Sequence, residues 1–325
     1  MNKTALVTSL GSVASEIVIK SLKRIGFRVV GCDIYPKEWV VESNSVDQFY
    51  QAPYVVEEEK YINFIHEICQ KESIGYLLPL IDPEVDLLSN NREWFEMKGI
   101  TLCISPKKSL DIIRNKLILA DFIKENVSSI NFIPTKMLSD CDKHEWDYPI
   151  VCKPYNGRSS QGLKYIYNDD EWDSFYTLAD KSVYIAEPYI KGPIVMVEII
   201  RHPKSKKVVT IARREVLSTP HGCGLTVYMF EDKKLEKACV ELAEKLDIIG
   251  CVNFEFIYNE EEKKYYFVEC NPRFSAGCKF SCMTGYECVI NHINCFSSGD
   301  IEDRHFYHNM YIARRYEEFV TKIEC

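Results

Sequence analysis

The stretch CVNFEFIYNEEEKKYYFVECNPRFSAG, residues 251–277, restricts the fold more than any other part of the sequence. Its apolar runs NFEFIY and YYFVEC alternate in polarity and are joined by the polar run NEEEKK, a pattern typical of a β-hairpin. Pairing the two strands about that turn predicts Phe254 opposite Cys270 and Phe256 opposite Val268 on one apolar face. We therefore expect an antiparallel strand pair here.

The other face of this hairpin carries acidic and amide side chains. Glu255 falls roughly opposite Glu269, and Asn271 follows on the same side. Such oxygens on one sheet face repel one another without a cation, and they are ligands that suit Mg²⁺. The alternative is a solvent-facing sheet surface, which fits residues 260–262 in the turn. It fits Glu269 poorly, because Asn-Pro then breaks the strand and brings in Arg273.

A second stretch, PIVCKPYNGRSSQG, has the residues that a phosphate site needs. Lys153 ends its apolar strand. The loop that follows carries small residues, namely Gly157, Ser159, Ser160 and Gly162. Small residues would let backbone N–H groups close over phosphate oxygens. The loop is not a Walker A motif, since no Gly-Lys-Ser/Thr opens a helix.

Lys116, in the helical run IIRNKLILADF, is a second candidate lysine for phosphate. The alternative is a lysine whose stem covers apolar surface while its charge stays in water. The stretches that follow it in the chain favour the phosphate interpretation.

Strand and helix signals alternate along the first ~100 residues, which predicts a parallel sheet with crossover helices. From Pro193 to Cys270 strand patterns dominate. We expect three lobes in series, over residues 1–105, 106–186 and 187–325.

Composition excludes several classes of protein. The chain has 325 residues, 46% hydrophobic and 27% charged, as in an ordinary soluble protein of more than one domain. No apolar run reaches the length of a membrane span, and no signal peptide opens the sequence, so we expect a cytoplasmic protein without a membrane partner. The net charge of −8 argues against a nucleic-acid partner.

The 14 cysteines are scattered along the chain, without a Cys-x-x-Cys pair. The densest group is Cys278, Cys282, Cys288 and Cys295, whose spacings match neither a zinc ribbon nor an iron–sulfur run. We interpret the cysteines as buried reduced thiols rather than as metal ligands.

Taken in order, these motifs resemble the ATP-grasp superfamily. The most similar branch is that of the carbamoyl-phosphate-synthase large subunit, which includes carboxylate–amine ligases. The resemblance spans about residues 2–300 and rests on these stretches: NK at 115–116, FIPT at 132–135, PIVCKPYNGRSSQG at 149–162, AEPYIKG at 186–192, and NFEF with VECNPRFSAG. It implies an α/β and α+β fold, in which a Rossmann-like (pre-ATP-grasp) domain precedes a two-lobed ATP-grasp fold with ATP between the lobes.

The resemblance also implies roles for the residues. Lys116 and Lys153 would contact the phosphates of ATP beneath the 157–162 loop. The backbone of a hinge strand would read the adenine edge, at Glu187, Pro188, Tyr189 and Ile190. One or two Mg²⁺ ions, with Mn²⁺ as a second candidate, would be held by Glu255, Glu269 and Asn271. Arg273 would stabilise charge on the transferred phosphoryl group and on the acyl phosphate.

This sequence departs from the family pattern at two positions. The family's hinge carries a glutamate for the ribose hydroxyls shortly after its glycine, where this chain has Pro193-Ile194. The family's Asp-Lys pair is Asn115-Lys116 here, which keeps the lysine.

The activity implied is an ATP-dependent ligase that forms a C–N bond. A small carboxylate would take the γ-phosphate of ATP as an acyl phosphate, and an amine would then attack it. The resemblance makes a homodimer plausible. Two alternatives stay open: a nucleotide-binding subunit without ligase turnover, and a nicotinamide-dependent oxidoreductase.

The acceptor pocket is expected to draw on IARREVLSTPHGCG. Arg213 and Arg214 alternate on a strand, so one should face the cleft, and analogy to the family favours Arg214. A solvent-facing arginine is the alternative for either. His221 would line the site or cap a turn. Asp82 and Glu84 would reach the acceptor from the first lobe, although a helix N-cap explains Asp82 equally well.

The oxidoreductase alternative rests on TSLGSVASE, residues 8–16. This stretch has one glycine, Gly11, where a dinucleotide fingerprint needs three. We therefore interpret Gly11 and Ser12 as a turn of the first lobe that faces the acceptor side of the cleft.

Overall fold

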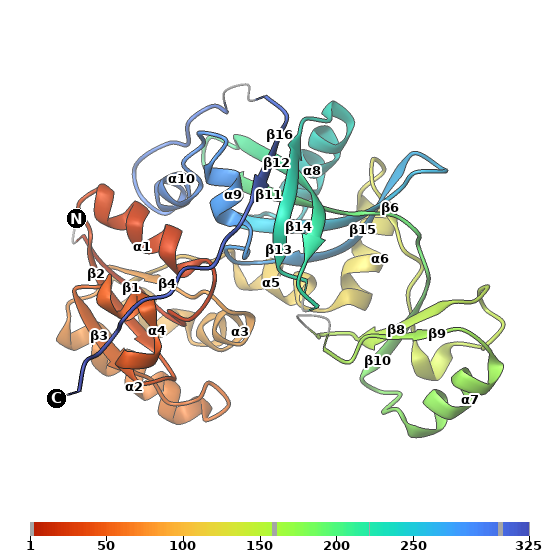
Figure 1. Ribbon diagram of the computed structural model, residues 1–325, viewed down its shortest axis with the longest axis horizontal. Coiled ribbons are helices and arrows are strands. Elements are labelled where there is room, and N and C mark those ends of the chain that lie inside the picture. Colours follow the sequence, from red (N-terminus) through yellow and green to blue (C-terminus); the bar gives the residue numbers. More distant parts are fainter. Residues whose placement is uncertain (1–2, 158–160, 221, 305–307, 325) are drawn as a thin grey trace.

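The computed structural model describes residues 3–157, 161–220, 222–304 and 308–324. Three bodies make up the molecule: an N-terminal domain, a large central sheet, and a small lobe at one side (Figure 1). Within the described residues, no helix has the length and apolar character needed to cross a membrane.

The N-terminal domain is a five-stranded parallel sheet in the order β3-β2-β1-β4-β5. Its strands are β1 (Thr4–Val7), β2 (Arg28–Asp33), β3 (Gln48–Gln51), β4 (Tyr76–Leu78) and β5 (Thr101–Leu102). Its helices are α1 (Ser15–Arg24), α2 (Glu58–Lys71), α3 (Asp82–Asn90) and α4 (Arg92–Met97), with short 3₁₀ turns at Lys37–Trp39 and Val41–Asn44. The alternating sequence pattern therefore predicted the parallel sheet correctly.

Helices cover both faces of this sheet, and its central strands β1 and β4 are buried on both sides. Val18 and Leu22 of α1 pack on one face, whereas Ile65 of α2 and Leu88 of α3 pack on the other. Helix α1 ends before Gly26, whose φ of +81° is typical of a helix C-terminus.

The small lobe is a four-stranded antiparallel sheet in the order β7-β10-β8-β9, covered by one helix. Its elements are β7 (Lys136–Met137), a 3₁₀ turn (Leu138–Asp140), β8 (Ile150–Pro154), β9 (Lys164–Ile166), α7 (Asp169–Leu178) and β10 (Tyr184–Pro188). Trp172 of α7 is buried against Ile150 and Cys152 of β8 in a core of its own.

The large sheet has seven strands in the order β16-β13-β12-β11-β14-β15-β6, antiparallel except where β6 joins β15. Its strands are β6 (Asn131–Phe132), β11 (Ile194–Arg201), β12 (Val208–Ser218), β13 (Gly224–Phe230), β14 (Gly250–Asn259), β15 (Lys264–Asn271) and β16 (Met310–Ala313). Its helices are α5 (Lys107–Ile113), α6 (Lys116–Asn126), α8 (Lys233–Lys245), α9 (Cys278–Cys282) and α10 (Cys288–Cys295).

The two faces of the large sheet pack against different partners. Leu119 of α6 and Leu242 of α8 belong to the core on one face. On the other face, α10 packs against α1, and this core continues into the N-terminal domain. The segment 106–186 is thus shared between two bodies, because α5, α6 and β6 join the large sheet rather than the small lobe.

The C-terminal segment returns to the N-terminal domain after β16 (Figure 1). The Thr321 hydroxyl donates to the Glu38 carbonyl at 2.5 Å, and Lys322 pairs with the Glu38 carboxylate. The first and last parts of the chain are therefore tied together on one side of the molecule.

Candidate active site

The paired carboxylates lie on β14 and β15 as predicted. Glu255 is directly opposite Glu269, and Phe254 is opposite Cys270. The pairing shifts by one residue after Glu255, so that Phe256 faces Phe267 rather than Val268, which the sequence had suggested.

The physical reason for this shift is a β-bulge, an extra residue in one strand that turns the next side chains. It keeps Phe256 and Phe267 in the core, whereas Val268 lines a cavity.

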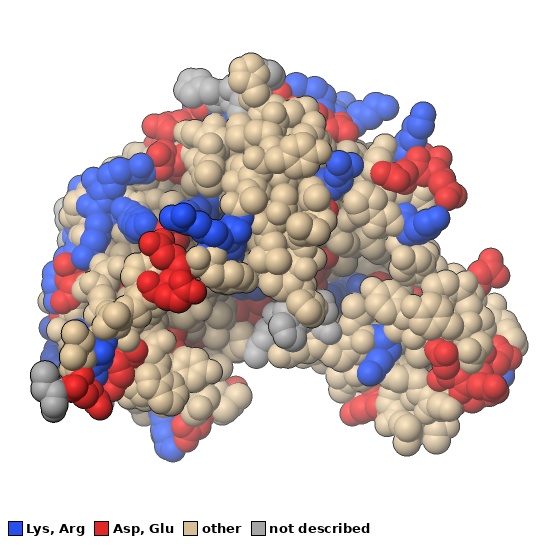
Figure 2. Space-filling view, viewed as in Figure 1, with Lys and Arg blue, Asp and Glu red and all other residues tan. Residues whose placement is uncertain are grey.

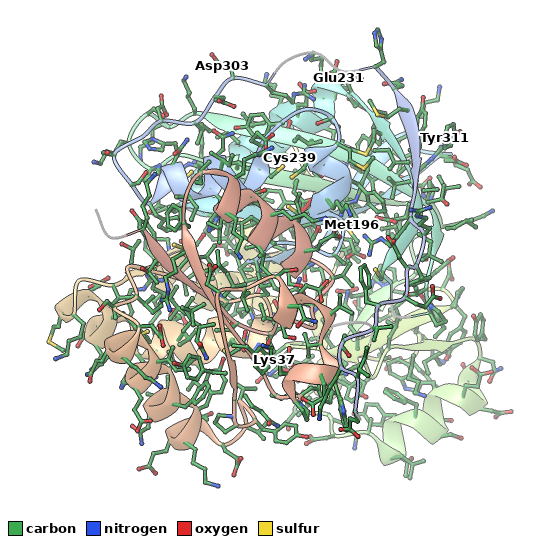
Figure 3. The ribbon with its side chains drawn as sticks, turned by 60° about the vertical axis from the view of Figure 1, so that its left-hand side comes forward. Lys37, Met196, Glu231, Cys239, Asp303 and Tyr311 are labelled. Atoms are coloured by element: carbon green, nitrogen blue, oxygen red, sulfur yellow. The ribbon has the colours of Figure 1, made fainter. Side chains whose placement is uncertain are left out.

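That cavity has a volume of about 530 Å³ and lies between the small lobe and the large sheet, within the size range of small-molecule sites. Figure 2 shows the small lobe standing apart from the N-terminal domain on one face. Apolar side chains line part of the wall, including Ile133, Val151, Leu163, Tyr165, Met196 and Ile257. Met196, labelled in Figure 3, comes from β11 beside β14.

The two predicted lysines reach this cavity from different bodies. Lys116 opens α6, because Asn115 caps the helix by accepting from two backbone N–H groups of its first turn. The Lys116 Nζ lies 3.0 Å from Glu269 Oε2 and donates to the Gly157 carbonyl at 2.7 Å. Lys153 of β8 lies 2.7 Å from Glu187 Oε2 of β10.

Burial and neighbouring charges shift the pKa values of the ionisable groups in the cavity. Burial and the neighbouring Glu269 raise the pKa of Glu255 to about 8. Burial also acts to raise the pKa of Glu269, but Lys116 and then Lys153 hold it below its ordinary value. Burial alone would lower the pKa of Lys153, whereas Glu187 raises it.

The donor set suits a divalent cation. Glu255 and Glu269 lie directly opposite each other, so their negative charges repel. The raised pKa of Glu255 favours its protonated form near neutral pH. A hard cation would replace that proton and take oxygens from both carboxylates and from Asn271. The Asn271 Nδ2 lies 3.4 Å from Glu269 Oε1, so the three side chains already adjoin.

Arg273 follows these ligands and joins them to the N-terminal domain. Its Nε and Nη2 donate to Asp82 Oδ2 at 3.2 and 2.8 Å, and Nη2 also lies 3.3 Å from Asn271 Oδ1. Asp82 is buried at the start of α3, and Arg114 lies 3.8 Å from its other oxygen. Sequence reasoning missed Arg114, which also pairs with Asp86 at 2.9 Å.

Of the two neighbouring arginines, the structure places Arg213 in the cavity wall, not Arg214. Arg213 is 2% exposed and donates to Glu198 at 2.7 Å. Successive residues of a strand point to opposite faces, so Arg214 lies on the other side of β12, over the Tyr228 ring. The expectation that Arg214 faces the cleft is therefore wrong.

Glu215, which sequence reasoning also missed, shares the face of Arg213 and lines the cavity. Its Oε1 accepts from Arg213 Nε at 3.3 Å, while its buried Oε2 has no hydrogen-bond partner among the described residues. A Cβ at Gly224 would lie 2.3 Å from that oxygen, so the glycine makes room for the carboxylate. Every second side chain of a strand points to the same face, so the sequence already placed Glu215 on the face of Arg213.

The first domain contributes less to the cavity than expected. Val13, after Gly11 and Ser12, lines it. The Gly11 N–H itself donates to Asp33 Oδ2 at 2.7 Å. Glu84 does not line the cavity. Its carboxylate is buried inside the domain, where it accepts from Thr8, Ser9 and Tyr61.

The segment expected to be the hinge lines the cavity, through Glu187, Pro188, Tyr189 and Ile190. Gly157 also lines it, as does Ile194, which stands where the resemblance implied a ribose-binding glutamate. Gly162, with φ of +75°, packs against Pro154 and Tyr184 next to the lining residues Gln161 and Leu163. Ser159, Ser160 and His221 lie outside the described residues.

Comparison with known families decides the classification. The model of the ATP-grasp domain matches residues 113–277, more than half of the chain. The chain is an ATP-grasp protein. The model of the PylC-like N-terminal domain matches residues 6–103 of this ATP-grasp chain.

Curated relatives of this ATP-grasp chain are much longer proteins. The carbamoyl phosphate synthase large chain of Clostridium acetobutylicum is 19% identical over 269 residues, which are 78% of this chain and 24% of that one. The chain thus spans about a quarter of the length of that relative. For the same protein of Agathobacter rectalis, 27% identity over 143 residues covers 41% of this chain and 13% of the relative.

Solved structures share the ATP-grasp fold along almost the whole chain. One is the biotin carboxylase domain dimer of Hydrogenobacter thermophilus 2-oxoglutarate carboxylase, in complex with MgADP, ADP and bicarbonate. It is 18% identical, with a TM-score of 0.77, and the match covers 95% of this chain and 73% of that one. N5-carboxyaminoimidazole synthetase of Staphylococcus aureus is 17% identical, with a TM-score of 0.74, and the match covers 93% of this chain and 79% of that one. An L-amino acid ligase of Bacillus licheniformis is 16% identical, with a TM-score of 0.69, and the match covers 90% of this chain and 73% of that one.

Proposed function

We propose that this protein is an ATP- and Mg²⁺-dependent ligase that activates a small carboxylate as an acyl phosphate and joins it to an amine through a C–N bond. The observation that carries this proposal is the convergence of Glu255 and Glu269 with Lys116 and Lys153 in one cavity. The relatives support it, since their names include an amino acid ligase, a carboxyaminoimidazole synthetase and a carbamoyl phosphate synthase.

Each residue has a role in the proposed reaction. Glu255, Glu269 and Asn271 would hold Mg²⁺, with Mn²⁺ as a substitute, and the metal supplies charge neutralisation at the phosphates. Lys116 and Lys153 would bind phosphate oxygens, and the hinge backbone from Glu187 to Ile190 would face the adenine.

Arg273 would neutralise charge as a carboxylate oxygen attacks the γ-phosphorus and the bond to the ADP oxygen breaks. The amine then attacks the acyl carbon, the phosphate leaves, and the amine gives up a proton. The protein supplies position and charge rather than a nucleophile.

The acceptor end supports an amine as the second substrate. Glu215 presents a buried carboxylate oxygen that has no partner among the described residues, and a cationic ammonium group would satisfy it. Arg213 holds the other oxygen, and so fixes the direction of the carboxylate.

We further propose a cytoplasmic homodimer. The described cysteines are free thiols, most of them buried, and thiols persist in a reducing compartment. The dimeric structural neighbour of Hydrogenobacter thermophilus supports the dimer proposal.

The test is phosphate release from ATP in the presence of Mg²⁺ and a panel of carboxylate–amine pairs. Glu269→Gln should lower the rate by about a hundredfold, because it removes a charged ligand from the phosphate site. Glu262→Gln, in the exposed turn of the same hairpin, is the matched control and should keep the rate. Full turnover by Glu269→Gln would disprove the metal site. Tight ATP binding without release for any pair would instead identify a nucleotide-binding subunit.

A further inference from the structure

Three thiols meet where β14, α9 and α10 pack together, and a fourth lies beside them. Among the residues that the structure describes, the sulfurs of Cys278, Cys282 and Cys288 all lie within 4.8 Å of one another. Cys251 of β14 adds a fourth thiol, which interacts with the sulfur of Cys278. Three of these residues belong to the densest cysteine group of the sequence, whose spacings predicted reduced thiols and not metal ligands. The sequence did not indicate the contact with Cys251, because that residue lies on a distant strand.

The local structure of α9 and α10 brings the sulfurs of Cys278, Cys282 and Cys288 close together. Cys278 and Cys282 are four residues apart on α9, so their side chains share one face of the helix. Gly285, with φ of +93°, lies in the turn that leads to α10, and Cys288 is the first residue of that helix. The backbone N–H of Cys288 interacts with the Cys282 sulfur, which joins the end of α9 to the start of α10.

The spacing of the sulfurs suits a tetrahedral metal. Zinc–sulfur bonds of about 2.3 Å at tetrahedral angles place sulfurs about 3.8 Å apart. The observed limit of 4.8 Å leaves a closure of about 1 Å or less between any two of the three sulfurs. Thiolates are soft ligands, which favour Zn²⁺ over the Mg²⁺ of the neighbouring oxygen site.

We propose that Cys278, Cys282 and Cys288 form a structural site for a thiophilic divalent metal, Zn²⁺, and that Cys251, which contacts Cys278, completes it as fourth ligand after a side-chain rotation. This site is separate from the Mg²⁺ site and does not depend on the proposed ligase activity.

Access to solvent agrees with the proposal. Cys282 is half-buried, whereas the other three are buried, so a metal has an entry point and is then shielded from solvent.

The site would stabilise the loop that serves the active site. Cys278 directly follows Gly277, which lines the cavity, and the segment from Asn271 to Gly277 carries Arg273. A metal bound to α9, α10 and β14 would fix the end of this segment to the large sheet.

The experiment uses the full chain, purified under reducing, anaerobic conditions and stripped with a chelator. We expect Co²⁺ to bind with about one ion per chain and to give thiolate charge-transfer and tetrahedral ligand-field bands. Zn²⁺ should displace it and raise the Tm. Failure of the unmutated protein to give these bands would overturn the proposal, and so would disulfides among these thiols that form in place of metal binding under reducing conditions.

Variants locate the site. Cys282→Ser should weaken Co²⁺ binding at least about tenfold while the protein stays folded, because this side chain is only half-buried. Cys288→Ser and Cys251→Ser should act in the same direction. Cys295→Ser, a buried cysteine at the other end of α10, is the matched control and should keep the bands. Unchanged spectra for folded Cys282→Ser, or loss of the bands in Cys295→Ser, would place the metal elsewhere.

Discussion

Asp82, at the start of α3, binds the guanidinium of Arg273 across 191 residues of sequence. One oxygen accepts from both Nε and Nη2, and the Asp82 side chain is 2% exposed. The N-terminal domain thus positions the arginine that we assign to the transferred phosphoryl group.

Replacing Asp82 by Asn should lower kcat by roughly tenfold to a hundredfold with little change in the KM for ATP, because Arg273 loses the charge that fixes its direction. Steady-state phosphate release measures both constants. Asp86→Asn on the same helix is the control, because among the described residues Asp86 pairs with Arg114 and not with Arg273. Equal kcat for Asp82→Asn and unmutated protein would show that Arg273 needs no such support.

Lys153→Met should weaken ATP binding at least about tenfold in calorimetry, since a charged contact to phosphate is lost. It should also lower the free energy of unfolding by about 3 kcal/mol, because it leaves Glu187 buried without its cation. Adding Glu187→Gln should restore stability without restoring ATP binding. Lys164→Met, exposed on β9, should change neither quantity. Recovery of ATP binding by the double variant would contradict the phosphate role.

Ile194 lines the cavity at the position where the family places a ribose-binding glutamate. An isoleucine offers no hydrogen bond to a ribose hydroxyl, so 2′-deoxy-ATP should bind within about threefold of ATP. Loss of a hydrogen bond to a charged partner would instead weaken nucleotide binding tenfold or more. Competition binding with both nucleotides makes the comparison, and a tenfold preference for ATP would mean that another group holds the 2′-hydroxyl.

Glu215→Gln should raise the KM for the amine about tenfold or more and leave ATP binding unchanged, because it removes the charge proposed to meet the ammonium group. Varying the amine at saturating ATP gives this constant. Glu231→Gln, whose carboxylate pairs with Arg304 away from the cavity, is the control. An unchanged KM would remove Glu215 from amine recognition.

Glu84 predicts a pH dependence of stability. Burial raises its pKa above the ordinary 4.5, against the lowering effect of its hydroxyl partners. The folded chain therefore holds this proton more tightly than the unfolded chain. This contribution to the free energy of unfolding is fully present below pH 4.5 and is lost as pH rises through the folded pKa.

Urea unfolding across this pH range should show Glu84→Gln gaining stability relative to the unmutated protein as pH rises. The exposed Glu58→Gln on α2 should follow the unmutated protein at every pH. A difference between Glu84→Gln and the unmutated protein that stays constant with pH would mean that Glu84 has the same pKa in both states.

The sequence allowed the hairpin to be predicted as far as Glu255, because alternation of period two fixes which residues share a face. It did not reveal the bulge beyond Glu255, since one extra residue leaves each strand's own pattern almost intact. Helix signals around Asn115 predicted a single helix, whereas the Asn115 cap divides it into α5 and α6. Strand β3 was missed because its end residues, Gln48 and Gln51, are exposed and weaken the apolar pattern.

The candidate site was predictable where motifs are local, as for Lys153 and its loop. Alternation alone could not choose between Arg213 and Arg214, because the strand has two faces and the sequence does not say which one adjoins the cavity. The contacts of Asp82 with Arg273, and of Cys251 with Cys278, depend on the packing of distant elements, which no spacing in the sequence encodes.

Lys116 and Lys153 are each neutralised by a carboxylate of the cavity, Glu269 and Glu187. Under the proposed function, loading of nucleotide would be an exchange of counter-ions, in which phosphates take the lysines and the released Glu269 becomes free to bind the metal. Nucleotide and metal would then strengthen each other's binding by the same factor. Such a site would favour ATP and Mg²⁺ together over either one alone.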